Sequence, residues 1–138
     1  MLLLALMIWY NFVPDWRILT LPFFTAIAIA AALGGGLWLA ALNVRYRDFR
    51  HIVPFIVQFG FYISPVAYSS SIIPQKWRLL YSLNPMVGVI DGFRWATLSG
   101  ASNIYLPGFL LSTILVAVLL VSGIWYFRKT ERTFADVI

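Results

Sequence analysis

The feature that most constrains this chain is an apolar run without a single charge, ILTLPFFTAIAIAAALGGGLWLAAL, over residues 18–42. As an α-helix these 25 residues extend about 37 Å, more than the roughly 30 Å of hydrocarbon in a bilayer. Pro22 lies in the first turns, where its missing N–H costs little. The run therefore predicts a membrane-spanning helix with some tilt.

The composition extends this conclusion to the whole chain. Of its 138 residues, 62% are hydrophobic and only 11% are charged. A soluble domain carries about 25% charged residues, so this chain has too few charges to cover a surface in water. A water-soluble enzyme and a disordered tail are therefore excluded, and the length allows one domain. Because the sequence has no cysteine, a disulfide scaffold and a Cys-ligated metal are excluded as well.

Charges divide the rest of the chain into segments that together predict an all-α, polytopic integral membrane protein. Residues 1–13 are apolar but too short to span, so we expect them to be part of a membrane helix. Residues 107–127 are long enough to span, and the helix is expected to end before the charged residues 128–138. These last residues are expected as a tail in water, and residues 43–51 as a polar linker.

Another span is expected over residues 52–73, which carry no formal charge. Pro65 lies deep inside this stretch, just after Gly60, so the helix is expected to kink or stop near Ser64. The expected architecture has three full spans, a partial one at the N-terminus, and a segment before the last span that needs separate treatment.

Small residues recur in the first span, where Ala32, Gly36 and Ala40 are spaced by four and share one helix face. This pattern lets two membrane helices approach closely, so we expect close packing on that face. The alternative is that the neighbouring glycines only loosen the helix.

Residues 76–98 allow two topologies, because they are apolar enough to enter lipid yet contain four charged side chains. Their uncharged centre of 12 residues is short for a span, and Asn84-Pro85 should break a helix there. Asp91 and Arg94 would each cost about 2.5–3.5 kcal/mol in the bilayer unless they paired, which their spacing allows. We therefore favour two short re-entrant helices over a single span.

The distribution of Lys and Arg is compatible with both topologies. With a re-entrant segment, the linker and the tail share a side that holds six of these residues, and four lie opposite. With a span, the two sides hold six and three. Both arrangements satisfy the positive-inside rule, and the spanning one does so by the wider margin.

Three pieces of the chain resemble the permease subunit of ABC-2-type polysaccharide exporters: ALNVRYRDFRHIVPFIVQFGFYISPVAY, LYSLNPMVGVIDGFRW and a tail ending in FADVI. That family moves O-antigen, capsular polysaccharide or teichoic acid out of bacteria. The likeness covers nearly all of the chain, and its Arg-Tyr-Arg-Asp, Ser-Pro and Leu-Asn-Pro motifs follow the family's order and spacing. The chain looks like the C-terminal half of such a permease, beginning inside the third helix.

The resemblance implies a topology and a set of partners. In such permeases both ends lie in the cytoplasm, and two short gate helices on the outer side precede the last span. It therefore implies re-entry for 76–98, and a cytoplasmic linker and tail, in the bacterial inner membrane. The implied partners are two copies of an ABC ATPase, a second permease copy, membrane lipid, and a polysaccharide or lipid-linked glycan as substrate. The chain has no Gly-x-x-x-x-Gly-Lys-Ser/Thr loop, so ATP hydrolysis is expected on the partner.

The linker is the candidate contact with that ATPase. Its arginines present planar donors suited to carboxylates, and its aromatic residues are of types enriched at protein interfaces. The residues of this set are Arg45, Tyr46, Arg47, Asp48, Phe49 and Arg50. The alternative is that the arginines bind anionic headgroups and set the orientation of the protein.

The outer gate is assigned to Asn84, Pro85, Asp91 and Arg94. Charged side chains within a membrane segment are functional by default. We therefore expect Asp91 and Arg94 to latch the gate, or Arg94 to meet an anionic part of a glycolipid. The alternative is that both lie in water at the outer interface and have no role.

Aromatic residues form two further groups. A possible channel lining follows the i, i+3, i+4, i+7 spacing of one helix face and consists of Phe55, Gln58, Phe59 and Tyr62. More commonly such side chains face lipid or neighbouring helices. The second group is expected as an interfacial aromatic belt, with substrate contact as the sharper alternative, and comprises Tyr68, Trp77, Tyr81, Trp95 and Tyr105.

The leading hypothesis is a transmembrane permease subunit of an ATP-driven exporter of polysaccharide, free or lipid-linked, across the bacterial inner membrane. The alternative is a truncated, non-transporting membrane interaction protein. His51 is the one histidine, so no metal, cofactor or catalytic residue is expected. The net charge of +5 is concentrated in the linker, the tail and the gate, so nucleic acid is not an expected partner.

Overall fold

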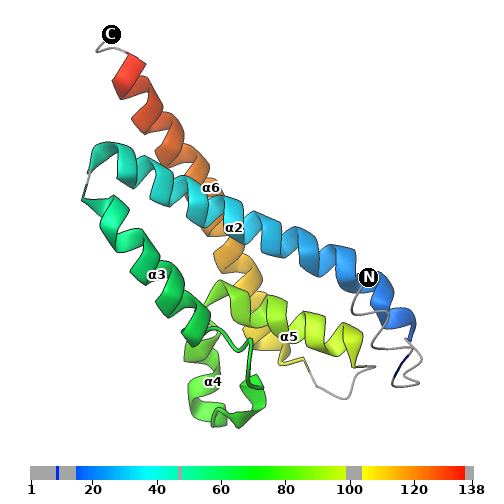
Figure 1. Ribbon diagram of the computed structural model, residues 1–138. Helices are drawn as coiled ribbons and strands as arrows, with labels where there is room; N and C mark the ends of the chain where they lie inside the picture. The colour runs from blue at the N-terminus through cyan, green and yellow to red at the C-terminus, as the bar shows by residue number, and fades with distance from the viewer. Residues whose placement is uncertain (1–8, 10–14, 47, 99–103, 136–138) are drawn as a thin grey trace.

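The computed structural model describes Trp9 and residues 15–46, 48–98 and 104–135, and these parts of the chain contain helices and loops only (Figure 1). The expected partial span at 1–13 lies outside the described residues except for Trp9. The elements are η1 (Trp16–Thr20), α2 (Leu21–Arg45), α3 (Phe49–Ile63), η2 (Ser70–Ile72), α4 (Gln75–Tyr81), α5 (Pro85–Thr97) and α6 (Leu106–Ala135). The all-α class is confirmed for this part of the chain.

The first expected span is α2 together with the short helix η1 before it. The Asp15 carboxylate accepts a hydrogen bond from Trp16 N, which begins η1, and Pro22 lies at the start of α2. The two helices form one stretch, Trp16–Arg45, that is long and apolar enough to cross a membrane. The predicted span at 18–42 is therefore confirmed as a helix of sufficient length, extended at both ends.

The last expected span is α6. Its stretch Leu106–Glu131 is also long and apolar enough to cross a membrane. The helix does not end before residue 128, however, but continues to Ala135. This difference has a simple cause, because Arg, Lys and Glu are good helix formers and no proline or glycine follows to stop the helix.

The third expected span is shorter than predicted. α3 has 15 residues, about 22 Å of helix, so a full span over 52–73 is not confirmed. The helix ends at Ile63 with Ser64 as its C-cap, which is where Pro65 predicts a stop. Asn84-Pro85 breaks the next segment in the same predicted way, because it separates α4 from α5 and begins the second of them.

The close contact between α2 and α6 is made by Gly34 and Gly123. A Cβ atom at Gly34 would lie 2.8 Å from Leu120 N, and one at Gly123 would lie 2.7 Å from the Gly34 carbonyl oxygen. Nothing lies within 4 Å of a Cβ built at Gly36, so within the described chain α6 does not pack at Gly36 on the predicted face. The helices do approach through small residues, but on the adjacent face of α2.

Aromatic rings close both sides of this crossing. Towards one end, Trp38 stacks on Tyr126 with 4.5 Å between ring centroids, and its Nε1 donates to Ser122 Oγ at 3.0 Å. Towards the other end, α5 lies against both long helices, and Phe24 contacts the rings of Phe93 and Phe109. The buried core beside it consists of Ile27, Ala31, Val89 and Val116.

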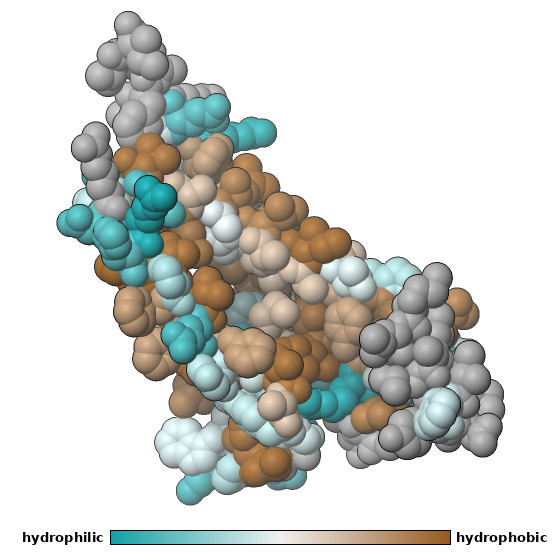
Figure 2. Space-filling model, in the orientation of Figure 1, coloured by the Kyte–Doolittle hydropathy of each residue, from teal (hydrophilic) through white to brown (hydrophobic). Residues whose placement is uncertain are grey.

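The elements are distributed between two ends of the molecule (Figure 1). The turn from α2 to α3 lies near the C-terminal end of α6, whereas η1, α4 and α5 lie at the opposite end. Figure 2 shows apolar surface along the long helices, with hydrophilic side chains gathered near the ends. The segment 76–98 therefore starts and finishes at one end of the molecule.

Candidate functional site

The charged pair of the gate segment (76–98) forms within one helix. Arg94 Nη1 lies 3.7 Å from Asp91 Oδ1 on successive turns of α5, and the two side chains are 21% and 17% exposed. The pairing that their spacing allows is therefore confirmed. Both side chains are thus partly buried within the fold.

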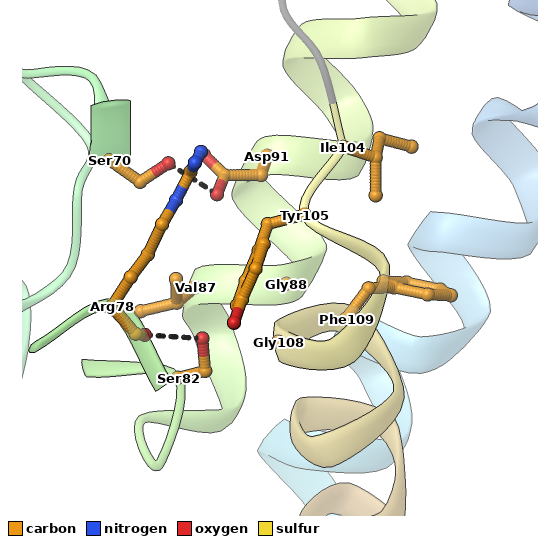
Figure 3. Close-up of a pocket in the computed structure, with 10 residues that line it drawn as sticks. All are labelled: Ser70, Arg78, Ser82, Val87, Gly88, Asp91, Ile104, Tyr105, Gly108 and Phe109. Carbon is orange, nitrogen blue, oxygen red and sulfur yellow. Dashed lines mark hydrogen bonds between the residues drawn. The ribbon is translucent and has the colours of Figure 1, made fainter. Parts of the chain in front are cut away.

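Both members of the pair also bind the chain that follows α3. Ser70 Oγ donates to Asp91 Oδ2 at 2.5 Å, as Figure 3 shows. Arg94 Nη2 donates to the carbonyl oxygens of Pro65 at 2.8 Å and Val66 at 3.3 Å. Hydrogen bonds to an ionised donor or acceptor are roughly twice as strong as neutral ones. The pair thus holds the loop after α3 against α5.

Asn84 serves two helices at once. Its Oδ1 accepts from Met86 N at 3.0 Å and so caps α5, in the manner typical of asparagine at this position. Its Nδ2 donates to Ser64 Oγ at 3.0 Å, and that hydroxyl donates to the Gly60 carbonyl at 2.7 Å. The side chain that begins α5 is therefore bound to the last turn of α3.

Two tyrosines complete this junction. Tyr81 OH donates to the Ile63 carbonyl at 2.7 Å, and Tyr68 OH reaches the same carbonyl at 3.2 Å. The two hydroxyl oxygens lie 2.6 Å apart. Burial, followed by the hydrogen bond with Tyr68, raises the pKa of Tyr81, so its hydroxyl stays protonated. Carbonyls that the end of α3 leaves unpaired thus find donors on α4 and the loop.

Sequence reasoning placed both tyrosines in an aromatic belt and missed Ser64 and Ser70 as functional polar residues. A signal was present, because a helix that stops before proline leaves carbonyls that need donors. Which donors supply them depends on tertiary contacts across 18 to 29 residues of sequence, which spacing does not reveal.

A small cavity adjoins the pair between α4, α5 and the start of α6 (Figure 3). Its volume is about 10 Å³, room for about one water molecule. Arg78 extends across it towards Ser70 and Asp91, with its guanidinium carbon 5.0 Å from the centre of the Tyr105 ring. A space of this size fits a structural water and excludes a sugar ring.

The linker lies on the surface at the other end of the molecule. Arg45, Tyr46, Asp48 and Arg50 are exposed, Phe49 is half-buried as the first residue of α3, and Arg47 lies outside the described residues. Arg45 places its guanidinium carbon 5.6 Å from the centre of the Tyr46 ring. The described part of the linker is therefore free to contact another protein or headgroups.

The possible channel lining lies on α3, a helix with no buried residue. Phe55, Phe59 and Tyr62 are 62%, 64% and 67% exposed, and Gln58 is exposed too. The structure thus keeps the four side chains on an open helix, and it brings none of them to the gate pair. In the described part of the chain, no cluster of His, Asp or Glu could hold a metal ion.

The described residues thus form helices, two of them long and apolar enough to cross a membrane, and the polar contacts of the site position helices against one another. The chain belongs to the ABC-2 type transporter family, whose family model matches residues 1–98. It is similar to an O-antigen export system permease protein of Myxococcus xanthus, with 33% identity over 67% of this chain and 36% of that protein.

Two O-antigen export system permease proteins of Klebsiella pneumoniae are 27% and 24% identical over 72% and 86% of this chain. The matched regions make up 38% and 45% of those proteins, so the chain spans less than half the length of these curated relatives. No solved structure matches the chain.

Proposed function

We propose that this chain acts as part of the permease of an ATP-driven exporter, which moves polysaccharide or a lipid-linked glycan across the bacterial inner membrane. The observation that carries the proposal is the family match over residues 1–98, together with relatives named as O-antigen export permeases. Hydrolysis of ATP belongs to separate ATPase subunits in this proposal, two per assembly, and a second permease copy completes the pathway.

The proposed topology has the linker, the end of α6 and the ATPase on the cytoplasmic side. The gate segment re-enters from the outer side, and α2, α3 and α6 contribute the spans. Two observations support this arrangement: the linker and the end of α6 lie at one end of the molecule, and α4 and α5 lie at the other (Figure 1). The 15 residues of α3 are too short to cross the bilayer alone, so this span also needs neighbouring residues. The segment that follows α3 is residues 64–72.

The function is tested by deleting the gene that carries this chain and restoring it with and without its ATPase partner. We expect polysaccharide to disappear from the cell surface on deletion and to return only when both proteins are present. Surface polysaccharide is measured by labelling intact cells. If the restored protein reaches the membrane and surface polysaccharide does not depend on it, the exporter proposal is wrong and the non-transporting alternative stands.

The topology is tested with single cysteines, because the sequence contains none. His51→Cys on the linker and Gln75→Cys at the start of α4 replace exposed side chains. We expect a membrane-impermeant maleimide to label Gln75→Cys in intact cells and His51→Cys only after permeabilisation. Equal labelling of both from outside, or labelling with the opposite sidedness, would contradict the proposed orientation.

A further inference from the structure

The position of α3 between the linker and the gate suggests a mechanical role for this helix. α3 begins at Phe49, directly after the exposed linker residues, and it ends at Ile63, where the gate segment holds it. Between these ends it has no buried residue within this chain. Apolar packing therefore does not fix α3 to the rest of the described chain.

At its C-terminal end, α3 is held by polar bonds rather than by apolar packing. An open groove of about 510 Å³ separates the apolar sides of α3 and α5, lined by Val57, Phe61 and Ile63 on one side and by Pro85, Met86 and Ile90 on the other. Across this groove the two helices do not interlock. At one edge polar bonds connect the end of α3 to the two gate helices: Tyr81 of α4 donates to the Ile63 carbonyl, and Asn84, the N-cap of α5, donates to Ser64.

The hydrogen bonds of Tyr81 and Asn84 join the end of α3 to the two gate helices, so they can pass a movement of α3 to the gate segment. Asn84 is the N-cap of α5. Its side chain donates to Ser64 Oγ, which in turn donates to the Gly60 carbonyl in the last turn of α3. Tyr81 is the last residue of α4, and it donates to the carbonyl of Ile63, the last residue of α3. A shift or rotation of α3 therefore pulls on both gate helices at their shared break, where turn hydrogen bonds such as that from Asn84 N to the Tyr81 carbonyl at 3.2 Å replace the helical pattern.

We propose that α3 is a lever that passes a displacement of the linker to the gate segment, and that Tyr81 and Asn84 are the positioning residues that transmit it. The proposal rests on the proposed function, and it adds that the ATPase moves the linker and that the gate segment opens outward. It assigns positioning roles to these two side chains. Their effect is exerted through the end of α3.

The variant that tests the lever combines Tyr81→Phe with Asn84→Ser. Phenylalanine keeps the ring of residue 81 and removes its hydroxyl, and serine is as good an N-cap as asparagine but too short to reach Ser64. Both gate helices therefore keep their local stabilisation while their two direct side-chain bonds to the end of α3 are removed; the bonds of Asp91 and Arg94 to the loop after α3 are left unchanged. The matched control is Tyr126→Phe, because the Tyr126 ring stacks on Trp38 and its hydroxyl takes part in no hydrogen bond within the described chain.

Movement is read in the full-length permease with its ATPase, reconstituted in lipid. Spin labels on cysteines at Val57 of α3 and Val121 of α6 report the lever, and labels at Leu98 and Val121 report the gate; all three positions are exposed. On ATP binding we expect both distances to change in the parent protein and in the Tyr126→Phe control. In the double variant we expect the α3 distance to change alone.

Function is read in the same preparation. In the double variant we expect glycan export to fall about tenfold, the effect of losing hydrogen bonds of ordinary strength, while ATP hydrolysis continues. If the parent exports normally and the double variant shows gate movement or export at the parent level, the lever proposal is wrong. If the parent itself does not export, the proposed function fails instead, so the two failures are distinguishable.

Discussion

The two long helices and the α3 junction join their parts by opposite means. α2 and α6 meet backbone to backbone at Gly34 and Gly123, with aromatic rings packed on either side of the crossing. α3 meets α5 across an open groove, and side-chain hydrogen bonds at one edge connect them. The first contact depends on shape and the second on a few donors and acceptors.

This difference separates a fixed part of the molecule from a movable one. Close packing is lost steeply with distance, because dispersion forces act only over contact range. A hydrogen bond to a carbonyl can exchange its partner for a neighbouring carbonyl or for water at little net cost. We therefore expect α2 and α6 to hold their relative positions while α3 changes its own.

The largest effect is expected from Gly34→Val, which places a branched side chain where even a Cβ would lie 2.8 Å from the backbone of α6. The long helices must separate, and we expect a loss of about 3 kcal/mol or more, beyond the usual range for an overpacked core. The measurement is the midpoint of thermal unfolding of the purified permease in detergent.

The matched control is Gly36→Val, two residues along the same helix, where a Cβ meets nothing within 4 Å. Its unfolding midpoint should stay close to that of the parent protein. Equal destabilisation by both variants would mean that the cost comes from helix propensity rather than from the crossing, and the comparison drawn above would fail.

An intermediate effect is expected from exchanging the gate charges, Asp91→Arg with Arg94→Asp. If the two residues formed only an ion pair, the exchange would restore what either single reversal removes. Arg94 also donates to the carbonyls of Pro65 and Val66, and an aspartate at that position has no donor for them. We therefore expect export to remain impaired, with about 1.5–3 kcal/mol lost from the junction.

The readout is export by the exchanged protein beside each single reversal, with equal amounts of permease in the membrane. Arg94→Lys is the informative companion, since it keeps the charge and one donor and should retain more export than the exchange. Full recovery in the exchanged protein would show that the pair acts alone and that its bonds to the loop are dispensable.

The smallest effect is expected from Trp38→Phe, which keeps a ring against Tyr126 and removes the bond to Ser122 Oγ. The loss should be about 1 kcal/mol, the worth of one neutral hydrogen bond. Trp125→Phe is the control, because Trp125 is 63% exposed. Thermal unfolding measures both, and a loss at Trp38 as large as that at Gly34→Val would show that the ring, rather than the backbone contact, fixes the crossing.

Much of the fold could be predicted, because it follows from local chemistry. Apolar length predicts α2 and α6, Pro65 predicts the end of α3, and Asn84-Pro85 predicts the break between α4 and α5. The ion pair of Asp91 with Arg94 follows from helical spacing alone. Each of these predictions involves residues within a few positions of one another.

The predictions that failed depend on tertiary position. Gly34 and Gly36 look alike in sequence, and only the rotation of α2 against α6 decides which of them meets the other helix. The helix through residues 128–135 was missed because charge was taken as a signal for the end of a helix, although it marks only the end of an apolar stretch. The roles of Tyr81 and Ser70 arise from folding the chain back on itself.

The crossing of the two long helices also limits where a sugar chain can travel. The backbones of α2 and α6 touch, and the rings of Trp38 and Phe24 pack on the two sides of this contact. The helices therefore cannot separate along their length without losing both ring contacts. If the chain acts in the proposed exporter, we therefore expect the passage for the glycan on the side of α3, where side chains such as Phe55 and Phe59 remain uncovered within this chain. On the two proposals above, the glycan and the moving helix would share one face, so the arriving glycan would itself displace α3.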